Sequence, residues 1–133
     1  MLRSALAFGC DGLILSDDCP DLYSPKVLRA AMGGVFRQPV LVSRDLPELI
    51  RSMREKGIDT LAAALDRSAM TSDEARLDRD GVAVVIGNEG SGLSAEMIEA
   101  CGKTVFIPIS ARSESLNASV ASSIFLWEMR RRG

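Results

Sequence analysis

Short apolar runs alternate with amphipathic segments along the chain. The apolar runs predict strands at Leu13–Leu15, Pro39–Val42, Thr60–Leu65, Val82–Ile86 and Val105–Ile109. Apolar residues at helical spacing, with capping residues at the ends, predict helices over Met1–Phe8, Pro25–Met32, Asp45–Lys56, the residues between Ser94 and Gly102, and Ser115–Arg131. This alternation is typical of an α/β protein with a mostly parallel sheet and helices on both faces.

The segment Val82–Ser94, V-A-V-V-I-G-N-E-G-S-G-L-S, stands at the centre of this pattern. Its β-branched run predicts a strand buried on both faces, and the three glycines that follow allow backbone N–H groups to approach a ligand. Ser94 then provides an N-cap for the next helix. Neither the P-loop ending nor the dinucleotide-binding glycine spacing is present. The segment therefore predicts a ligand-binding strand, loop and helix start, without fixing the ligand.

A second polar cluster follows the last predicted strand, between Ile107 and Asn117. Ser113 or Ser115 suits an N-cap, and either also suits a ligand contact. Asn117 is a poor helix former whose amide could donate and accept toward a ligand, or bond locally to the backbone. Glu89, in the glycine loop, is either an orienting carboxylate or a solvated one. These alternatives stay open at the level of the residues.

The amino-acid composition restricts both the class of protein and the kinds of site that this chain can have. The 133 residues, 47% hydrophobic and 26% charged, suit one soluble domain, and no apolar run is long enough to cross a bilayer. Three cysteines without metal-ligand spacing, and no signal peptide, favour the reducing cytoplasm. The absence of histidine excludes the usual general base and zinc ligand, so no metal is expected. A net charge of −2 requires any nucleic-acid contact to use a local basic patch.

Two segments resemble motifs of a known family. Ile86–Ser94 (I-G-N-E-G-S-G-L-S) and Ile107–Ala121 (I-P-I-S-A-R-S-E-S-L-N-A-S-V-A) are similar to motifs 2 and 3 of the SpoU, or TrmH-type, branch of the SPOUT RNA methyltransferases. Arg3–Gly9 (R-S-A-L-A-F-G) matches the end of motif 1, and Ser24–Val40 resembles the family's second helix. The resemblance covers the whole chain. It implies methyl transfer from S-adenosylmethionine to a ribose 2′-hydroxyl of rRNA or tRNA.

The same resemblance implies a C-terminal trefoil knot and a homodimer whose active sites draw on both subunits. The small residues at 118, 119 and 121–123 suit close helix packing in such a dimer, and equally suit a contact within the chain. The asparagine and glycine of motif 1 would precede Met1, which predicts that residues 1–133 are the catalytic domain of a longer protein. Its RNA-recognition domain would then lie outside this sequence.

The resemblance also assigns site residues. Those implied around the transferred methyl and the ribose are Arg3, Glu89, Ser115 and Asn117. Those implied to contact the cofactor are Gly87, Gly90, Ile107 and Leu116 through the backbone, and Leu65 and Ile109 around the adenine. A guanidinium does not readily release its proton, so Arg3 is better suited to hold a phosphate than to act as a base, although a solvated residue is the alternative. For RNA contact the candidates are Lys26, Arg29 and Arg37, each otherwise a solvated side chain.

Three functions are compatible with these residues. The first is a dimeric RNA ribose 2′-O-methyltransferase domain that uses S-adenosylmethionine without a metal. The second is a catalytically silent module that binds RNA or a protein partner. The third, a generic nucleotide-binding domain, would require both motif matches to be accidental. The presence of Arg3, Glu89 and Asn117 favours the enzyme, but the sequence does not identify the RNA or the modified nucleotide.

Overall fold

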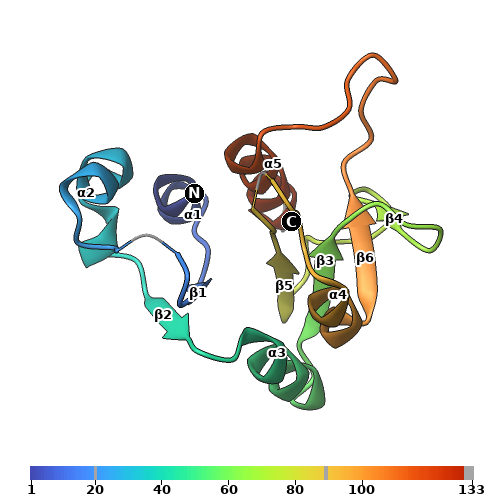
Figure 1. The fold of residues 1–133 in the computed structure, drawn as a ribbon, viewed down its shortest axis with the longest axis horizontal. Coiled ribbons are helices and arrows are strands. Elements are labelled where there is room, and N and C mark those ends of the chain that lie inside the picture. The colour runs from blue at the N-terminus through green and yellow to red at the C-terminus, as the bar shows by residue number, and fades with distance from the viewer. Residues whose placement is uncertain (20, 89, 131–133) are drawn as a thin grey trace. The chain divides into compact units, whose positions relative to one another are not determined.

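All pairings between the named strands are parallel in the computed structural model, which describes residues 1–19, 21–88 and 90–130, and at residue 35 the backbone alone (Figure 1). The strands alternate with helices, as the apolar pattern predicted. The chain forms two compact units, Met1–Leu46 and Pro47–Gly133. The predicted class, α/β with parallel strands, is therefore confirmed.

The first unit pairs two short strands and carries three helical segments. Its elements are α1 (Leu2–Ala7), β1 (Leu13–Ser16), α2 (Pro25–Ala31), the 3₁₀ helix η1 (Gly34–Phe36) and β2 (Val40–Ser43). β1 and β2 run parallel, with Leu13 opposite Val40. The start of α2 follows from its sequence, because Pro25 suits a first turn and the Ser24 hydroxyl accepts a hydrogen bond from Val27 N at 3.3 Å.

The second unit contains a four-stranded sheet in the order β4-β6-β3-β5. Its elements are α3 (Leu46–Glu55), β3 (Asp59–Ala63), β4 (Met70–Thr71), β5 (Val82–Val85), α4 (Ala95–Cys101), β6 (Lys103–Phe106) and α5 (Ala118–Arg130). The segment from β5 through α4 to β6 crosses over β3. α4 begins and ends where predicted, since Ser94 accepts from Met97 N at 3.1 Å and Gly102 takes φ +79°.

Helices cover both faces of this sheet, as predicted. On one face, Leu61 and Val105 belong to the buried cluster that includes Phe125 of α5. On the other face, the Thr60 hydroxyl donates to the carbonyl of Cys101, the last residue of α4, at 2.9 Å. Because successive side chains of a strand point to opposite faces, these contacts of Thr60 and Leu61 place α4 and α5 on opposite sides.

Two details differ from the sequence prediction. β5 is an edge strand of the four-stranded sheet and is half-buried, whereas β3 is the strand with a buried centre. Residues 66–80, which lie outside the predicted strands, contribute the short strand β4 and bury Ala75 and Leu77 in the core. A local apolar pattern indicates that a strand is buried, but its position in the sheet depends on pairing with distant segments.

The last helix also differs from its prediction. α5 begins at Ala118, three residues later than expected, and its side toward the sheet carries Phe125 and Met129. Val120 and Trp127 are also among the apolar residues at helical spacing in this segment, but both of these side chains are exposed. The spacing of apolar residues thus identified the helix but not the face that packs on the sheet.

Polar contacts join α3 and the start of β3 to neighbouring elements. Arg54 of α3 donates from Nη1 to the Ala100 carbonyl of α4 at 3.0 Å. Asp59 forms ion pairs with Arg79 and with Lys103, whose Nζ lies 3.0 Å from Oδ1. Burial opposes ionisation of Asp59, but the hydrogen bonds from Arg79 and Lys103 outweigh it and hold the pKa of this carboxyl below its ordinary value.

Candidate functional site

The carboxyl ends of β3, β5 and β6 lie together at one edge of the sheet. The parallel register pairs Ala62 with Val85 and Ala63 with Val105, so the three chains leave the sheet side by side. The next residues along them include Leu65, Gly87 and Ile107, all predicted cofactor contacts. Ligands of parallel sheets bind beyond such strand ends. The structure therefore brings three segments of the predicted cofactor site to one edge.

Apolar side chains are exposed in the segments that follow these strand ends. Leu65 is 78% exposed, Ile109 41% and Leu116 36%. Single exposed aliphatic side chains are ordinary, whereas a contiguous patch of them indicates a binding surface. An adenine ring offers a flat apolar face of the kind that such side chains can cover. The three exposed side chains are therefore accessible for the cofactor contacts that the resemblance predicts.

The glycine loop after β5 closes on itself. Gly92 N donates to the Asn88 carbonyl at 3.1 Å, and the Asn88 side-chain oxygen accepts from Ser91 N at 2.9 Å. A Cβ at Gly87 would lie 2.4 Å from the carbonyl carbon of Gly92 and 2.7 Å from Leu93 N. Glycine is therefore required at position 87 by close approach of the loop's own backbone. Glu89, predicted to face the ribose, lies outside the described residues.

Asn117 caps α5 rather than extending into it. Its side-chain oxygen accepts hydrogen bonds from Ser119 N at 2.8 Å and Val120 N at 3.3 Å. The structure thus shows the local backbone bond that was the alternative for Asn117, and it rules out the N-cap alternative for Ser113 and Ser115. Ser113 donates from its hydroxyl to the Ser115 carbonyl at 3.1 Å. Ser115, Leu116 and Asn117 lie consecutively in the exposed segment that leads into α5.

Asp66 organises the turn after Leu65, a role that the sequence analysis did not assign. Its Oδ1 accepts hydrogen bonds from Ser68 N at 2.8 Å and from the Thr104 hydroxyl at 2.9 Å. The hydrogen bonds from Ser68 are the main cause of a lowered pKa for the Asp66 carboxyl, followed by the bond from Thr104. An aspartate two residues before a serine is a local turn signal. The partner 38 residues away had no signal in the sequence.

The predicted RNA-contacting residues belong to the first unit. Lys26 and Arg29 are exposed on α2, and Arg37 is exposed directly after η1. Arg3 is exposed on α1 in the same unit, whereas Ser115 and Asn117 belong to the second. No ion pair involves Lys26, Arg29 or Arg37 among the residues that the structure describes.

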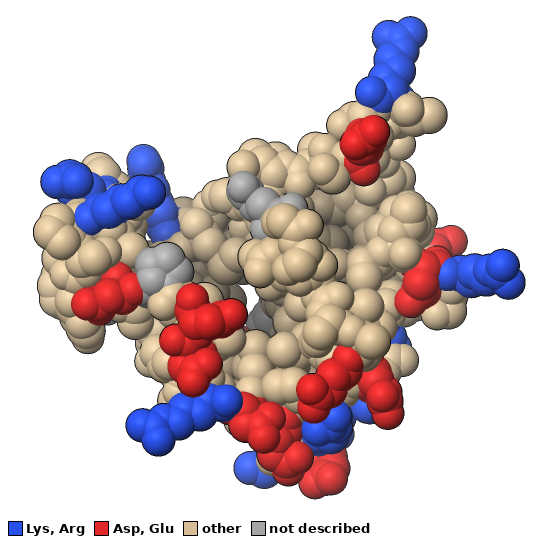
Figure 2. Space-filling model, viewed as in Figure 1, with Lys and Arg blue, Asp and Glu red and all other residues tan. Residues whose placement is uncertain are grey.

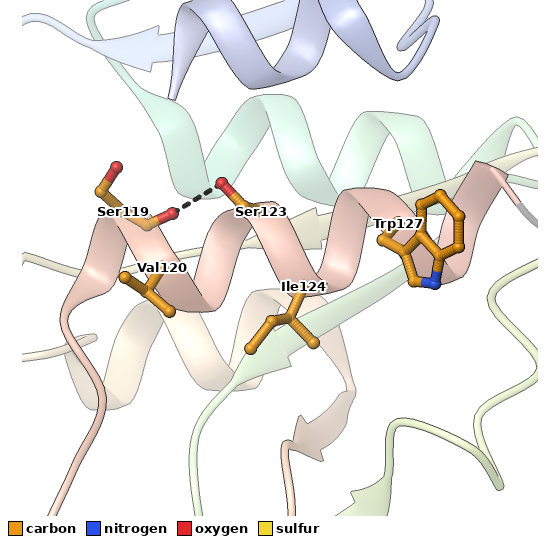
Figure 3. Close-up of a pocket in the computed structure, with 5 residues that line it drawn as sticks. All are labelled: Ser119, Val120, Ser123, Ile124 and Trp127. Carbon is orange, nitrogen blue, oxygen red and sulfur yellow. Dashed lines mark hydrogen bonds between the residues drawn. The ribbon is translucent and has the colours of Figure 1, made fainter.

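A pocket of about 320 Å³ lies along one side of α5. Its lining consists of Ser119, Val120, Ser123, Ile124 and Trp127, which project from successive turns of the helix (Figure 3). The Ser123 hydroxyl donates to the Ser119 carbonyl at 3.0 Å, and this bond is drawn in Figure 3. None of these five residues was predicted to contact the cofactor or the ribose. The small residues at 118, 119 and 121–123 thus lie on different sides of α5, since Ser122 is buried whereas Ser119 and Ser123 line the pocket.

Two classes of site are not found in the described residues. They contain no group of three or more acidic or cysteine side chains placed to hold a metal ion. No helix among them is long and apolar enough to cross a membrane.

The three cysteines, Cys10, Cys19 and Cys101, are all free thiols. Burial raises the pKa of the Cys101 thiol to about 11, despite the opposing charge of Arg54.

The parallel α/β fold, with a glycine loop after one strand and Asn117 before the last helix, agrees with the SPOUT class that the sequence motifs resemble. The model of the SpoU rRNA Methylase family matches residues 1–127. The chain belongs to this family, which confirms the resemblance seen in its motifs.

Individual relatives agree with this membership. The chain is 32% identical over 130 residues to a 23S rRNA (guanosine(2553)-2′-O)-methyltransferase, RlmP, of Bacillus subtilis, covering 98% of the chain and 51% of that protein. It is 37% identical over 131 residues to an uncharacterized tRNA/rRNA methyltransferase of Synechocystis, covering 98% of the chain and 47% of the relative. The chain thus spans about half the length of the curated relatives it matches.

Solved structures agree on the fold. An AdoMet-bound rRNA methyltransferase from Sinorhizobium meliloti superposes with a TM-score of 0.88 at 32% identity, covering 98% of this chain and 49% of that one. A putative RNA methyltransferase of the TrmH family from Porphyromonas gingivalis gives a TM-score of 0.87 at 32% identity, with 99% and 53% covered.

Proposed function

We propose that residues 1–133 are the methyltransferase domain of an RNA ribose 2′-O-methyltransferase that uses S-adenosylmethionine. The observation that carries the proposal is the convergence of Leu65, Gly87 and Ile107 at the carboxyl edge of one parallel sheet. Membership of the SpoU family, and the 2′-O-methyltransferase name of the Bacillus subtilis relative, support the reaction type. The substrate would be rRNA or tRNA.

The residues of the second unit would hold the cofactor. Backbone groups at Gly87, Gly90, Ile107 and Leu116 would bind its polar edges, and Leu65 and Ile109 would cover the adenine. When bound, S-adenosylmethionine supplies an electrophilic methyl group on a sulfonium centre. The exposed aliphatic side chains and the main-chain groups at this edge fit such a ligand without requiring a metal or a histidine.

The remaining chemistry is positioning of the ribose. The 2′-oxygen must be aligned with the methyl carbon and must lose its proton as the new C–O bond forms. Arg3 is suited to hold an adjoining phosphate through two parallel N–H···O bonds, and Asn117, Ser115 and Glu89 offer polar groups for the ribose. The proton lost by the 2′-hydroxyl would pass finally to solvent water.

We also propose a cytoplasmic homodimer in which α5 contributes to the interface. Support comes from the exposed Val120 and Trp127 on the pocket side of α5, where serine side chains leave room for close approach. A knotted C-terminal segment and contributions of both subunits to each active site remain part of the proposal. Light scattering on the protein and on Trp127→Glu tests it, because a charge in this face should produce monomers.

Calorimetry with S-adenosylmethionine tests cofactor binding directly. Saturable heat is expected, and folded protein that gives none at millimolar ligand contradicts the proposal for this chain. Transfer of labelled methyl to rRNA or tRNA then tests the reaction. A catalytically silent module is the alternative outcome, indicated by RNA binding without methyl transfer.

Matched variants at Asn117 separate capping from catalysis. Asn117→Asp keeps the oxygen that caps α5 but removes the amide N–H groups, and aspartate caps about as well as asparagine. Asn117→Ala removes both and should cost about 1 kcal/mol of stability. Loss of methyl transfer in Asn117→Asp, with unchanged thermal stability, supports a role at the ribose. Full activity in Asn117→Asp and in Arg3→Ala would show that the site assignment is wrong.

A further inference from the structure

Two aromatic side chains of the first unit are exposed next to one another. Tyr23 is 64% exposed and Phe36 73%, and their ring centroids lie 6.4 Å apart with the planes tilted by 41°. This separation is within the range at which aromatic rings interact. Single exposed apolar residues are ordinary, but two adjoining exposed rings form an apolar patch of the kind that contacts a partner. Neither Tyr23 nor Phe36 was predicted to contact the cofactor, the ribose or the RNA.

Hydrogen bonds fix the backbone of the two segments that carry the rings. Tyr23 N donates to the Asp21 side chain at 3.0 Å, directly before the Ser24 cap of α2. Phe36 is the last residue of η1, and its N–H donates to the Gly33 carbonyl at 3.2 Å. The next turn is fixed by Gln38, which is buried and donates to the Cys10 carbonyl at 3.0 Å. Tyr23 and Phe36 therefore project from two short segments, the turn before α2 and the helix η1, whose backbones are hydrogen-bonded.

The segment that carries both rings is basic. Residues 22–43 contain Lys26, Arg29 and Arg37 and no aspartate or glutamate. Figure 2 shows Lys and Arg side chains gathered over α2. Asp17, Asp18 and Asp21 precede this segment, and Asp21 accepts a hydrogen bond from Tyr23 N. Exposed aromatic rings together with cations that form no ion pair among the described residues suit single-stranded nucleic acid, because bases stack on the rings and cations contact the phosphates.

We infer that Tyr23 and Phe36 form a stacking platform for unpaired bases of the RNA substrate, with Lys26, Arg29 and Arg37 holding the backbone. The inference rests on the proposed function and extends it to the kind of RNA recognised. A ribose inside a regular helix is flanked by paired neighbours, whereas an unpaired nucleotide can be turned toward a cofactor. A platform for adjoining bases would therefore select loops or single-stranded segments.

Fluorescence anisotropy with labelled rA12, rU12 and a 12-base-pair RNA duplex tests this inference on the whole chain. Each of Phe36→Ala and Tyr23→Ala should weaken rA12 binding by about 5- to 140-fold, the effect of removing one stacked base. Duplex binding should stay unchanged. Phe36→Trp should retain rA12 binding, and Leu41→Ala, which removes an exposed aliphatic side chain from β2 in the same unit, should have no effect.

Salt dependence separates stacking from charge. The aromatic variants should keep the slope of log affinity against log salt concentration, whereas Lys26→Ala should reduce its magnitude by about 0.7, the value for one phosphate contact on a single strand. Wild-type rA12 affinity in both Phe36→Ala and Tyr23→Ala would overturn the inference. So would a change from dimer to monomer in Phe36→Ala with rA12 affinity retained, since the pair would then be a protein interface.

The same variants distinguish failure of this inference from failure of the proposed function. If the wild-type chain binds S-adenosylmethionine and transfers methyl groups while the aromatic variants bind RNA normally, the inference alone is wrong. If the platform binds rA12 as expected but the chain takes up no cofactor, the proposed function is wrong and the platform stands. Cofactor binding by each aromatic variant also verifies that it is folded.

Discussion

Gly87 offers the sharpest test of the loop geometry. A Cβ at this position would lie 2.4 Å from the carbonyl carbon of Gly92, 2.6 Å from its oxygen and 2.7 Å from Leu93 N. Carbon atoms in contact are ordinarily about 3.5–4.0 Å apart, so Gly87→Ala requires a backbone shift of about 1 Å. The atoms that must move are main chain, and a rotamer change cannot relieve the overlap. Forced overpacking of this kind costs about 1–3 kcal/mol.

Gly90→Ala is the matched control in the same loop. The nearest atom to a Cβ at Gly90 is the Asn88 side-chain oxygen at 4.0 Å, which is ordinary contact. This substitution should be neutral, or stabilise by up to about 1 kcal/mol because alanine restricts the unfolded chain. The difference between the two variants thus isolates the close approach at Gly87 from any general effect of losing a glycine.

Urea denaturation of the ligand-free variants, followed by circular dichroism, measures the difference. Gly87→Ala should lower the free energy of unfolding relative to wild type, whereas Gly90→Ala should not. Calorimetry should then show weaker S-adenosylmethionine binding by folded Gly87→Ala, because the displaced loop follows β5 at the cofactor edge. An unfolding free energy for Gly87→Ala equal to that of Gly90→Ala would refute the geometric reasoning.

Three further predictions concern stability and reactivity. The pKa of Asp59 is lowered in the folded state, so its ion pairs stabilise the protein above the unfolded pKa of about 3.9, and this contribution is lost as the pH falls through the folded value. Asp59→Asn should therefore lower the free energy of unfolding by about 1 kcal/mol at pH 7. In urea titrations below about pH 4, the difference between this variant and wild type should shrink. Cys101, 1% exposed and with a pKa of about 11, should resist Ellman's reagent at pH 8 until urea unfolds the chain, and rapid labelling of the native thiol would contradict its burial. Gly102→Ala should lower the melting temperature, because φ is +79° and the added Cβ would lie 2.6 Å from an Arg54 guanidinium nitrogen; the double variant with Arg54→Ala should recover the part due to this overlap, and full additivity would argue against it.

Local features of the fold were predictable because their causes are local. The caps at Ser24 and Ser94 and the left-handed Gly102 depend on residues within one helical turn of each. The alternation of apolar runs with amphipathic segments likewise determined a parallel α/β arrangement, which needs no knowledge of pairing order. The two motifs around the glycine loop and Asn117 were sufficient to indicate the family.

Which residues meet was decided by the tertiary structure. The sequence placed a glycine at 87 near a ligand, but the backbone contact with Gly92 that requires it exists only once the loop closes. Asp66 finds Thr104 because β3 and β6 are neighbours, and the half-buried state of β5 follows from its place at the edge of the sheet. Such features depend on pairing between segments far apart in the chain, and the periodicity of one segment does not specify which other segment it pairs with.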